Sequence, residues 1–339
     1  KSNSSRNKKI IMSNILVRSP RFETYTMGSS SNSIKLELYV AGVLRYTIIK
    51  NAAPSSVVTF EIAELIRDYI SQTFTGGITQ PVTVSTASSN VKQYTGQNAT
   101  GTEGSPTAIT HTAFNGYGTF MEGANPTLAA NSIWLLSKDV IKDGYYVYTP
   151  IGSSGWISQI TGGGTATQAG FNSATTSLTV GTTDVNIVRI DCTKYGDGKK
   201  ITFVNKFGAL QDLWFSLKSV KATDSSRETY NSNTISTSSG SATYSVNAPT
   251  KSVFNKTAKQ KITLSSGYYP EGANPYFEEL LLSDQVWLTQ PDPYNPSTEQ
   301  VVPVIITTSS FTYKTSLNDR LIDYVMEFEM AFDYINNVR

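Results

Sequence analysis

Alternation of apolar and polar residues predicts strands in the first part of the chain. Residues 34–40 place Ile, Leu, Leu and Val at every second position, the period-two pattern of a strand with one buried face. Ala41-Gly42 then permits a turn, and residues 57–62 predict a further strand after Pro54. Apolar residues within 62–70 follow helical spacing instead, so we expect a short amphipathic helix to pack on that sheet.

The clearest strand pattern lies near the C-terminus, where six alternate positions are apolar or aromatic: Tyr324, Met326, Phe328, Met330, Phe332 and Tyr334. Four carboxylates flank or separate these positions: Asp323, Glu327, Glu329 and Asp333. We expect a central, ordered strand that buries its aromatic face and exposes an acidic one. The acidic residues then either protect the strand from edge-to-edge aggregation or form a subunit interface with basic residues of a partner.

The second half of the chain combines buried strand patterns with polar stretches. Residues 185–190 and 199–204 flank Asp197-Gly198, which is a strong short-range signal for a β-hairpin. Residues 209–215 end in consecutive aromatic residues, typical of a strand buried on both faces. The Ser/Thr-rich residues 222–248 predict a surface hairpin or a mobile loop, which is either a solvated connection or a binding loop.

An internal repeat indicates how these elements are organised. The sequence EGANP occupies residues 122–126 and recurs at 271–275. A Gly-Tyr pair precedes both copies, and an aliphatic-Trp-Leu segment follows both. These matches favour two related modules, with Trp134 and Trp287 at equivalent buried strand positions.

The expected fold is mainly β, with two tandem antiparallel β-sandwich-like modules and at most short helices. The first module spans residues 12–160 and the second spans residues 186–339. A Gly/Thr-rich linker over residues 161–185 joins them, because Gly162-Gly163-Gly164 is the most flexible point of the sequence. Residues 1–11 precede a natural start at Met12, so we expect them to be an artefact of start assignment or a short basic arm.

Composition and charge narrow the choice of partners. Only 16% of the residues are charged, whereas the chain contains 19 Tyr and 14 Phe, which suits strands and polar turns better than helices. The net charge of +2 provides no global field that would concentrate nucleic acid. No apolar run reaches the roughly 18 to 20 residues that span a bilayer, and residues 1–11 lack an apolar signal core. We therefore expect neither nucleic acid nor a membrane as partner.

The sequence predicts no catalytic, cofactor-binding or metal-binding residue. His111 is the only histidine and Cys192 the only cysteine, so a triad using His or a centre with several His or Cys ligands cannot be built. We expect His111 at the surface or in a loop and Cys192 as a small buried residue. Phosphate-binding glycine motifs are absent from the sequence. Glu278-Glu279 could serve a glycosidase in principle, but a structural role is favoured, and we expect no enzyme.

Two segments carry a resemblance: ITFVNKFGALQDLWF at residues 201–215 and SFTYKTSLNDRLIDYVMEFEMAFDYINNVR at residues 310–339. They resemble structural proteins of environmental, largely marine, tailed bacteriophages, over well under half of the chain. The resemblance implies a virion component that is tail-associated and assembles with copies of itself and with other virion proteins. It implies no catalytic motif and no cofactor.

Two further functions stay open at this point. One is a head-associated structural protein of the same kind of virion. The other is a secreted adhesin or carbohydrate-binding module, in which loop aromatics such as Trp156 or Tyr268 would stack on sugars. The absence of an export signal argues against the second alternative.

Overall fold

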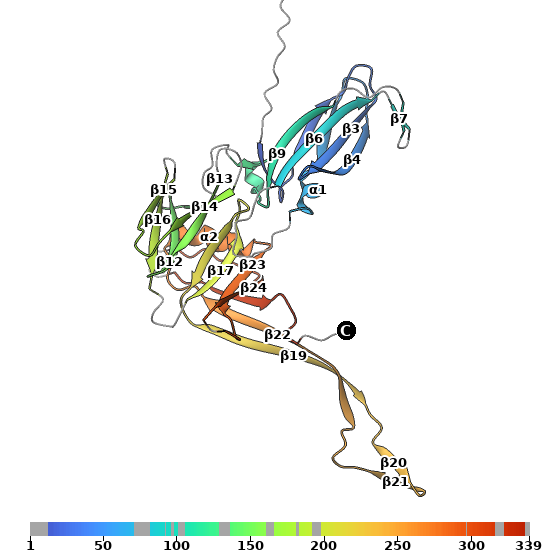
Figure 1. Cartoon of the computed structure of the whole chain (residues 1–339), viewed down its shortest axis with the longest axis vertical. Helices are drawn as coiled ribbons and strands as arrows, with labels where there is room; N and C mark the ends of the chain where they lie inside the picture. Colours follow the sequence, from blue (N-terminus) through green and yellow to red (C-terminus); the bar gives the residue numbers. More distant parts are fainter. Residues whose placement is uncertain are drawn as a thin grey trace, which may run out of the picture. The chain divides into compact units, whose positions relative to one another are not determined.

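Strands dominate the computed structural model of the chain, with 55% strand against 7% helix, so the mainly β fold is confirmed (Figure 1). The structure describes residues 13–70, 82–91, 93–95, 98–100, 106–128, 136–160, 166–180, 183–191, 198–295, 297–315 and 322–335. These residues contain two short α-helices, α1 at Ala63–Arg67 and α2 at Asn274–Leu281. Trp134, Cys192 and the possible basic arm at residues 1–11 lie outside the described residues.

The chain divides into two compact units, and both are discontinuous in sequence. The first comprises residues 1–190, 202–213 and 272–284, and the second comprises residues 191–201, 214–271 and 285–339. The sequence predicts two continuous modules instead, with a linker at 161–185. That range contains strands β14 (Ala166–Phe171) and β15 (Ser177–Val180) of the first unit. Local periodicity detects strands, but it does not show which distant segments pack together.

In the first unit, six strands form a sheet in the order β10-β1-β9-β6-β3-β4. Their bounds are β10 Thr127–Leu128, β1 Ser13–Leu16, β9 Thr107–Phe114, β6 Val82–Val91, β3 Ser33–Val40 and β4 Val43–Asn51. The predicted alternation over 34–40 is confirmed, because its four apolar side chains are buried. Ala41 and Gly42 both have positive φ, as the type I′ turn of a two-residue hairpin requires. Helix α1 adds Ile66 to this core, together with strands β2 (Phe22–Thr26) and β5 (Val57–Glu61).

The first unit also contains a four-stranded sheet, in the order β11-β12-β16-β15. Here β11 is Lys138–Asp139, β12 is Gly144–Pro150 and β16 is Thr183–Ile190. A hairpin of β13 (Gly155–Ile160) and β14 contributes Ile157 and Phe171 to the same core. Strand β16 pairs with β12 and β15, so the predicted hairpin across Asp197-Gly198 is wrong. One partner, β15, immediately precedes β16 in sequence, whereas the other, β12, lies more than 30 residues earlier.

Seven strands form the largest sheet, in the order β18-β17-β23-β24-β25-β22-β19. Their bounds are β18 Leu210–Phe215, β17 Lys199–Val204, β23 Val286–Pro291, β24 Glu299–Ile306, β25 Val325–Met330, β22 Lys251–Ser265 and β19 Ser219–Asn231. Strand β25 lies between β24 and β22, so the C-terminal strand is an internal strand of the sheet, as predicted. Its buried side chains include Phe328, which meets Phe215 edge to face at 5.9 Å between ring centroids.

The C-terminal strand is shorter than its sequence pattern predicts. It ends at Met330, and Phe332 and Tyr334 are 47% and 57% exposed. The chain bends after Met330, and the Tyr334 N–H donates to the Ala258 carbonyl rather than continuing the β24–β25 ladder. Once the backbone leaves the ladder, alternation of residue type no longer corresponds to alternation of faces.

Strands β19 and β22 continue as a two-stranded ribbon beyond the rungs that β22 shares with β25 (Figure 1). We call residues 224–258 the arm and residues 229–250 its tip. The tip carries a small hairpin of β20 (Ile235–Ser238) and β21 (Ser241–Tyr244), joined by a turn at Ser239-Gly240. A bulge leaves Phe254 outside the β19–β22 register. The predicted surface hairpin within residues 222–248 is therefore confirmed.

Candidate functional site

The acidic residues proposed as a subunit interface lie on or beside β25, and three of them meet lysines of the same chain. The Glu329 carboxylate is 2.7 Å from Lys259 Nζ, and Asp323 is 3.6 Å from Lys314 Nζ. Glu327 lies 3.9 Å from Lys261 Nζ, which also pairs with Asp224 at 3.1 Å.

These ion pairs raise the pKa of Lys259 and of Lys261, mainly through the hydrogen bonds that the lysines donate to Glu329 and Asp224. Asp333 is exposed beyond the end of β25. Much of the acidic charge is therefore balanced within the sheet. Sequence reasoning missed these lysines because β22 lies far from β25 in sequence. The role of the four carboxylates as a subunit interface stays a prediction.

The two copies of the EGANP sequence adopt different conformations. In the first copy, a 3-10 turn over Phe120–Glu122 is followed by positive φ at Gly123 and Asn125. In the second copy, a 3-10 turn over Glu271–Ala273 continues directly into α2. This difference weakens the argument for a duplication. Trp287 is buried in β23 as predicted, whereas Trp134 cannot be compared with it because it lies outside the described residues.

His111 is buried in strand β9, so the prediction that it lies at the surface or in a loop is wrong. Its Nε2 atom lies 3.0 Å from the Glu23 carboxylate, which also accepts a hydrogen bond from Arg21. Burial alone would raise the pKa of Glu23, but His111 and Arg21 together lower it. The pairing of β2 with β5 and the position of β9 bring these residues together, which no local pattern could reveal.

A second buried carboxylate belongs to Glu279 of α2. Ser137 Oγ donates a hydrogen bond to it, and the Lys206 backbone N–H donates another at 3.2 Å. Burial is the largest influence and raises the pKa of Glu279 to about 7, while the two hydrogen bonds oppose that change. Glu278 is adjacent on the helix and is half-buried. Because neighbouring helical residues do not share a face, these two carboxylates are not arranged as a facing acid/base pair.

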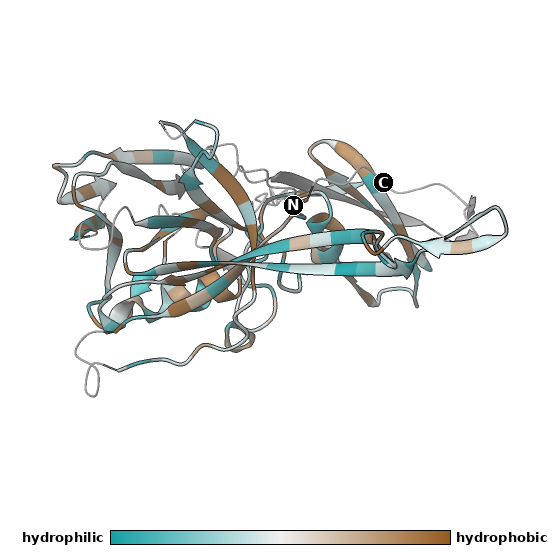
Figure 2. Cartoon of the chain, turned by 90° about the horizontal axis from the view of Figure 1, so that it is seen from below, coloured by the Kyte–Doolittle hydropathy of each residue, from teal (hydrophilic) through white to brown (hydrophobic). Residues whose placement is uncertain are grey.

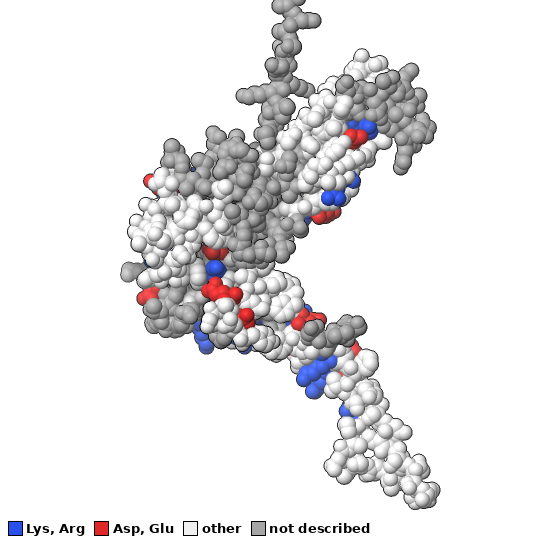
Figure 3. Space-filling model, in the orientation of Figure 1, with Lys and Arg blue, Asp and Glu red and all other residues white. Residues whose placement is uncertain are grey.

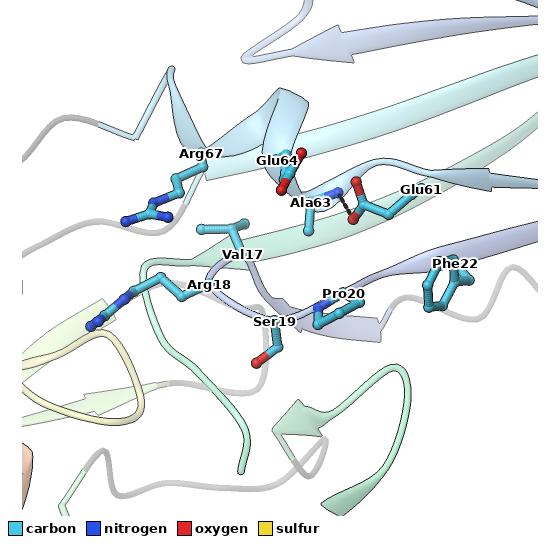
Figure 4. Close-up of a pocket in the computed structure, with 9 residues that line it drawn as sticks. All are labelled: Val17, Arg18, Ser19, Pro20, Phe22, Glu61, Ala63, Glu64 and Arg67. Atoms are coloured by element: carbon cyan, nitrogen blue, oxygen red, sulfur yellow. Dashed lines mark hydrogen bonds between the residues drawn. The ribbon is translucent and has the colours of Figure 1, made fainter. Parts of the chain in front are cut away.

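A groove of about 450 Å³ opens beside α1 in the first unit (Figure 4). Nine residues line it: Val17, Arg18, Ser19, Pro20, Phe22, Glu61, Ala63, Glu64 and Arg67. The Asp284 carboxylate accepts hydrogen bonds from Arg18 at 3.0 Å and from Arg67 at 2.9 Å. Glu61 accepts a hydrogen bond from the Ala63 N–H at 2.8 Å. Arg18, Arg67 and Glu61, three of the charged residues that line this groove, are therefore already hydrogen-bonded to groups of the same unit.

The arm presents the most distinctive surface that the structure describes. No charged residue occurs between Glu228 and Lys251, and Figure 3 shows the corresponding end of the arm without Lys, Arg, Asp or Glu. Figure 2 shows mostly hydrophilic or neutral residues along its strands, with isolated hydrophobic ones. Six large apolar or aromatic side chains of the arm are 53% to 89% exposed: Tyr230, Ile235, Tyr244, Val246, Val253 and Phe254.

The described residues contain neither a cluster of metal-ligating side chains nor a helix that could span a membrane. No three His, Cys, Asp or Glu side chains there gather closely enough to hold a metal ion. In the same part of the chain, no helix has the length and apolar character needed to cross a bilayer. Comparison of the chain with protein-family models, curated proteins and solved structures yields no match.

Proposed function

We propose that this chain is a tail-associated structural component of a tailed-phage virion and works by assembling with copies of itself and other virion proteins. The resemblance of residues 201–215 and 310–339 to phage structural proteins supplies the setting. The proposal includes two antiparallel β-sandwich-like modules, interleaved in sequence rather than in tandem. Most of the observed ladders are antiparallel, although β1 pairs with β9, and β12 with β16, in parallel.

The observation that carries the assembly role is the exposed arm. An isolated two-stranded ribbon is marginally stable in water, because neither of its faces is covered. Here the ribbon exposes large apolar side chains and has a charge-free tip, a combination that favours association in solution. Such an arm is stabilised when a neighbouring protein covers it. Assembly is therefore the function that this geometry supports best.

Shortening the arm tests this role. In the variant, residues 232–250 are replaced by Asn-Gly, which joins Asn231 to its ladder partner Lys251 through a tight turn. We expect the full chain to sediment as a larger oligomer than the shortened chain, which loses every contact that the tip makes. Both should melt at similar temperatures, because the tip lies outside the buried core. A shortened chain that assembles as well as the full chain would contradict the assembly role of the tip.

The proposed location in the phage tail needs a separate measurement. We expect an antibody against this protein to label purified phage particles at the tail in electron micrographs. Labelling confined to the head would favour the head-associated alternative, and unlabelled particles would contradict a virion role.

Carbohydrate binding is the second candidate, favoured by the exposed tyrosines of a neutral tip rich in Ser, Thr and Asn. Aromatic rings with nearby hydroxyl and amide groups are suited to neutral sugars. Of the two residues proposed earlier, Tyr268 is exposed, whereas Trp156 is half-buried in β13. If the tip binds carbohydrate, the unmodified chain should bind at least one glycan of a glycan array, and Tyr244→Ala should lose that binding. Equal binding by Tyr244→Ala and the unmodified chain would count against recognition by the tip.

A further inference from the structure

Strand β19 forms an open edge of the seven-stranded sheet. It is the last strand in the sheet order, and each of its residues is exposed. It contains neither Pro nor Gly, and the bulge in its ladder lies on β22, so β19 itself is regular from Ser219 to Asn231. An edge of this kind presents backbone N–H and C=O groups that can accept another strand.

A second copy of β19 is a candidate for that strand, and symmetry restricts how it can pair. Two antiparallel edge strands in one sheet are related by a twofold axis perpendicular to the sheet. Facing residues then point to the same side, so the axis must lie midway between the two copies of one residue, which face each other across it. Only an axis at Ser225 pairs the whole strand, because it sets Ser219 opposite Asn231 of the second copy.

The side chains agree with that register. An axis at Asp224 would set two Asp224 carboxylates face to face, and an axis at Ser226 would set Asp224 against Glu228. With the axis at Ser225, no two charged residues stand directly opposite. Val220 faces Tyr230 of the second copy, and these side chains are 47% and 53% exposed in the single chain. Apolar pairs of this kind stabilise antiparallel ladders.

Charge complementarity extends to the neighbouring strand. In this register, Glu228 faces Ala222 of the second copy, whose small side chain leaves the space above it open. Ala222 pairs within its own chain with Lys261 of β22. Glu228 of one copy can therefore reach across Ala222 toward Lys261 of the other, and the symmetry produces this contact twice.

We propose that β19 pairs antiparallel with β19 of a second copy of this chain, about a twofold axis at Ser225. The inference deepens the proposed assembly function and rests on it for its biological role. The contact joins two seven-stranded sheets edge to edge.

Cysteine cross-linking tests the register in a Cys192→Ser background, which removes the native thiol. Two Ser225→Cys residues would have Cα atoms about 4.5 to 5.5 Å apart, within the range of a disulfide. Ser226→Cys is the matched control, because its two copies would lie about 8 Å apart, beyond that range. We expect mild oxidation to give a disulfide-linked dimer for Ser225→Cys and little for Ser226→Cys. Equal cross-linking by both, or by neither, would overturn the proposal.

Charge substitutions at Thr223 give a second readout. This exposed residue would face Arg227 of the second copy, and Lys221 lies on the same side of the strand. Thr223→Glu should tighten dimerisation and Thr223→Arg should weaken it, each on the order of tenfold across two symmetrical contacts. A dimer that responds to both substitutions in the same direction would refute this register.

The outcomes separate this pairing from the broader function. If Ser225→Cys fails to cross-link although shortening the tip reduces the size of the oligomer, the assembly function stands and the β19 pairing fails. If Ser225→Cys cross-links selectively although phage particles lack the protein, the pairing stands and the virion setting fails.

Discussion

Phe328→Ala is expected to lower the free energy of unfolding of the second unit by about 3 to 5 kcal/mol. Phe328 is completely buried on the internal strand β25, and its ring packs edge to face against Phe215. Truncation removes the buried aromatic surface and leaves a cavity between strands that the ladders on both sides hold in place. Urea denaturation followed by intrinsic fluorescence measures the loss.

Phe332→Ala is the matched control, because it removes the same ring four residues later in the same predicted pattern. Phe332 is exposed beyond the end of β25, so its truncation should change stability by no more than about 0.5 kcal/mol. Equal losses for the two variants would mean that the strand continues past Met330 and buries both rings.

The second large effect is a loss of stability as pH rises, caused by Glu279. Its pKa increases from 4.5 to about 7 in the folded chain, chiefly because the carboxylate is buried. A carboxyl group with a raised pKa binds its proton more tightly when folded than when unfolded. Its contribution to stability is therefore most favourable below about pH 4.5 and is lost as pH rises through about 7. The size follows from 1.36 kcal/mol per pH unit and is ~3 kcal/mol.

Glu279→Gln isolates this effect, because the amide stays neutral and can still accept the hydrogen bond from Ser137. We expect the variant to match the unmodified chain near pH 4.5 and to be more stable by ~3 kcal/mol at pH 8. Urea unfolding at a series of pH values gives the difference. Parallel stability curves for the two proteins across this range would show that Glu279 titrates normally.

The strands that alternate cleanly were predictable from sequence. Residues 34–40 and 324–330 each bury every second side chain because one face of their sheet meets a core. The turn at Ala41-Gly42 and the surface hairpin within residues 222–248 were also foreseen. In each case the signal lies within a few neighbouring residues, on the length scale at which periodicity and turn chemistry operate.

Long-range pairing was not predictable from these signals. Lys259 and Lys261 balance the acidic residues of β25 only because β22 lies beside it in the sheet. In the same way, His111 meets Glu23 because strands distant in sequence are brought together. A single sequence carries the residue types for such contacts but not the pairing that creates them.

The charge-free tip also determines where a protease can cut the arm. Trypsin cleaves after Lys and Arg, and none occurs between Arg227 and Lys251, both of which are exposed. Cleavage at these two positions would release residues 228–251 as one peptide. Any partner that covers the arm would slow its release, so the rate at which this fragment appears during digestion reports how much of the arm is covered.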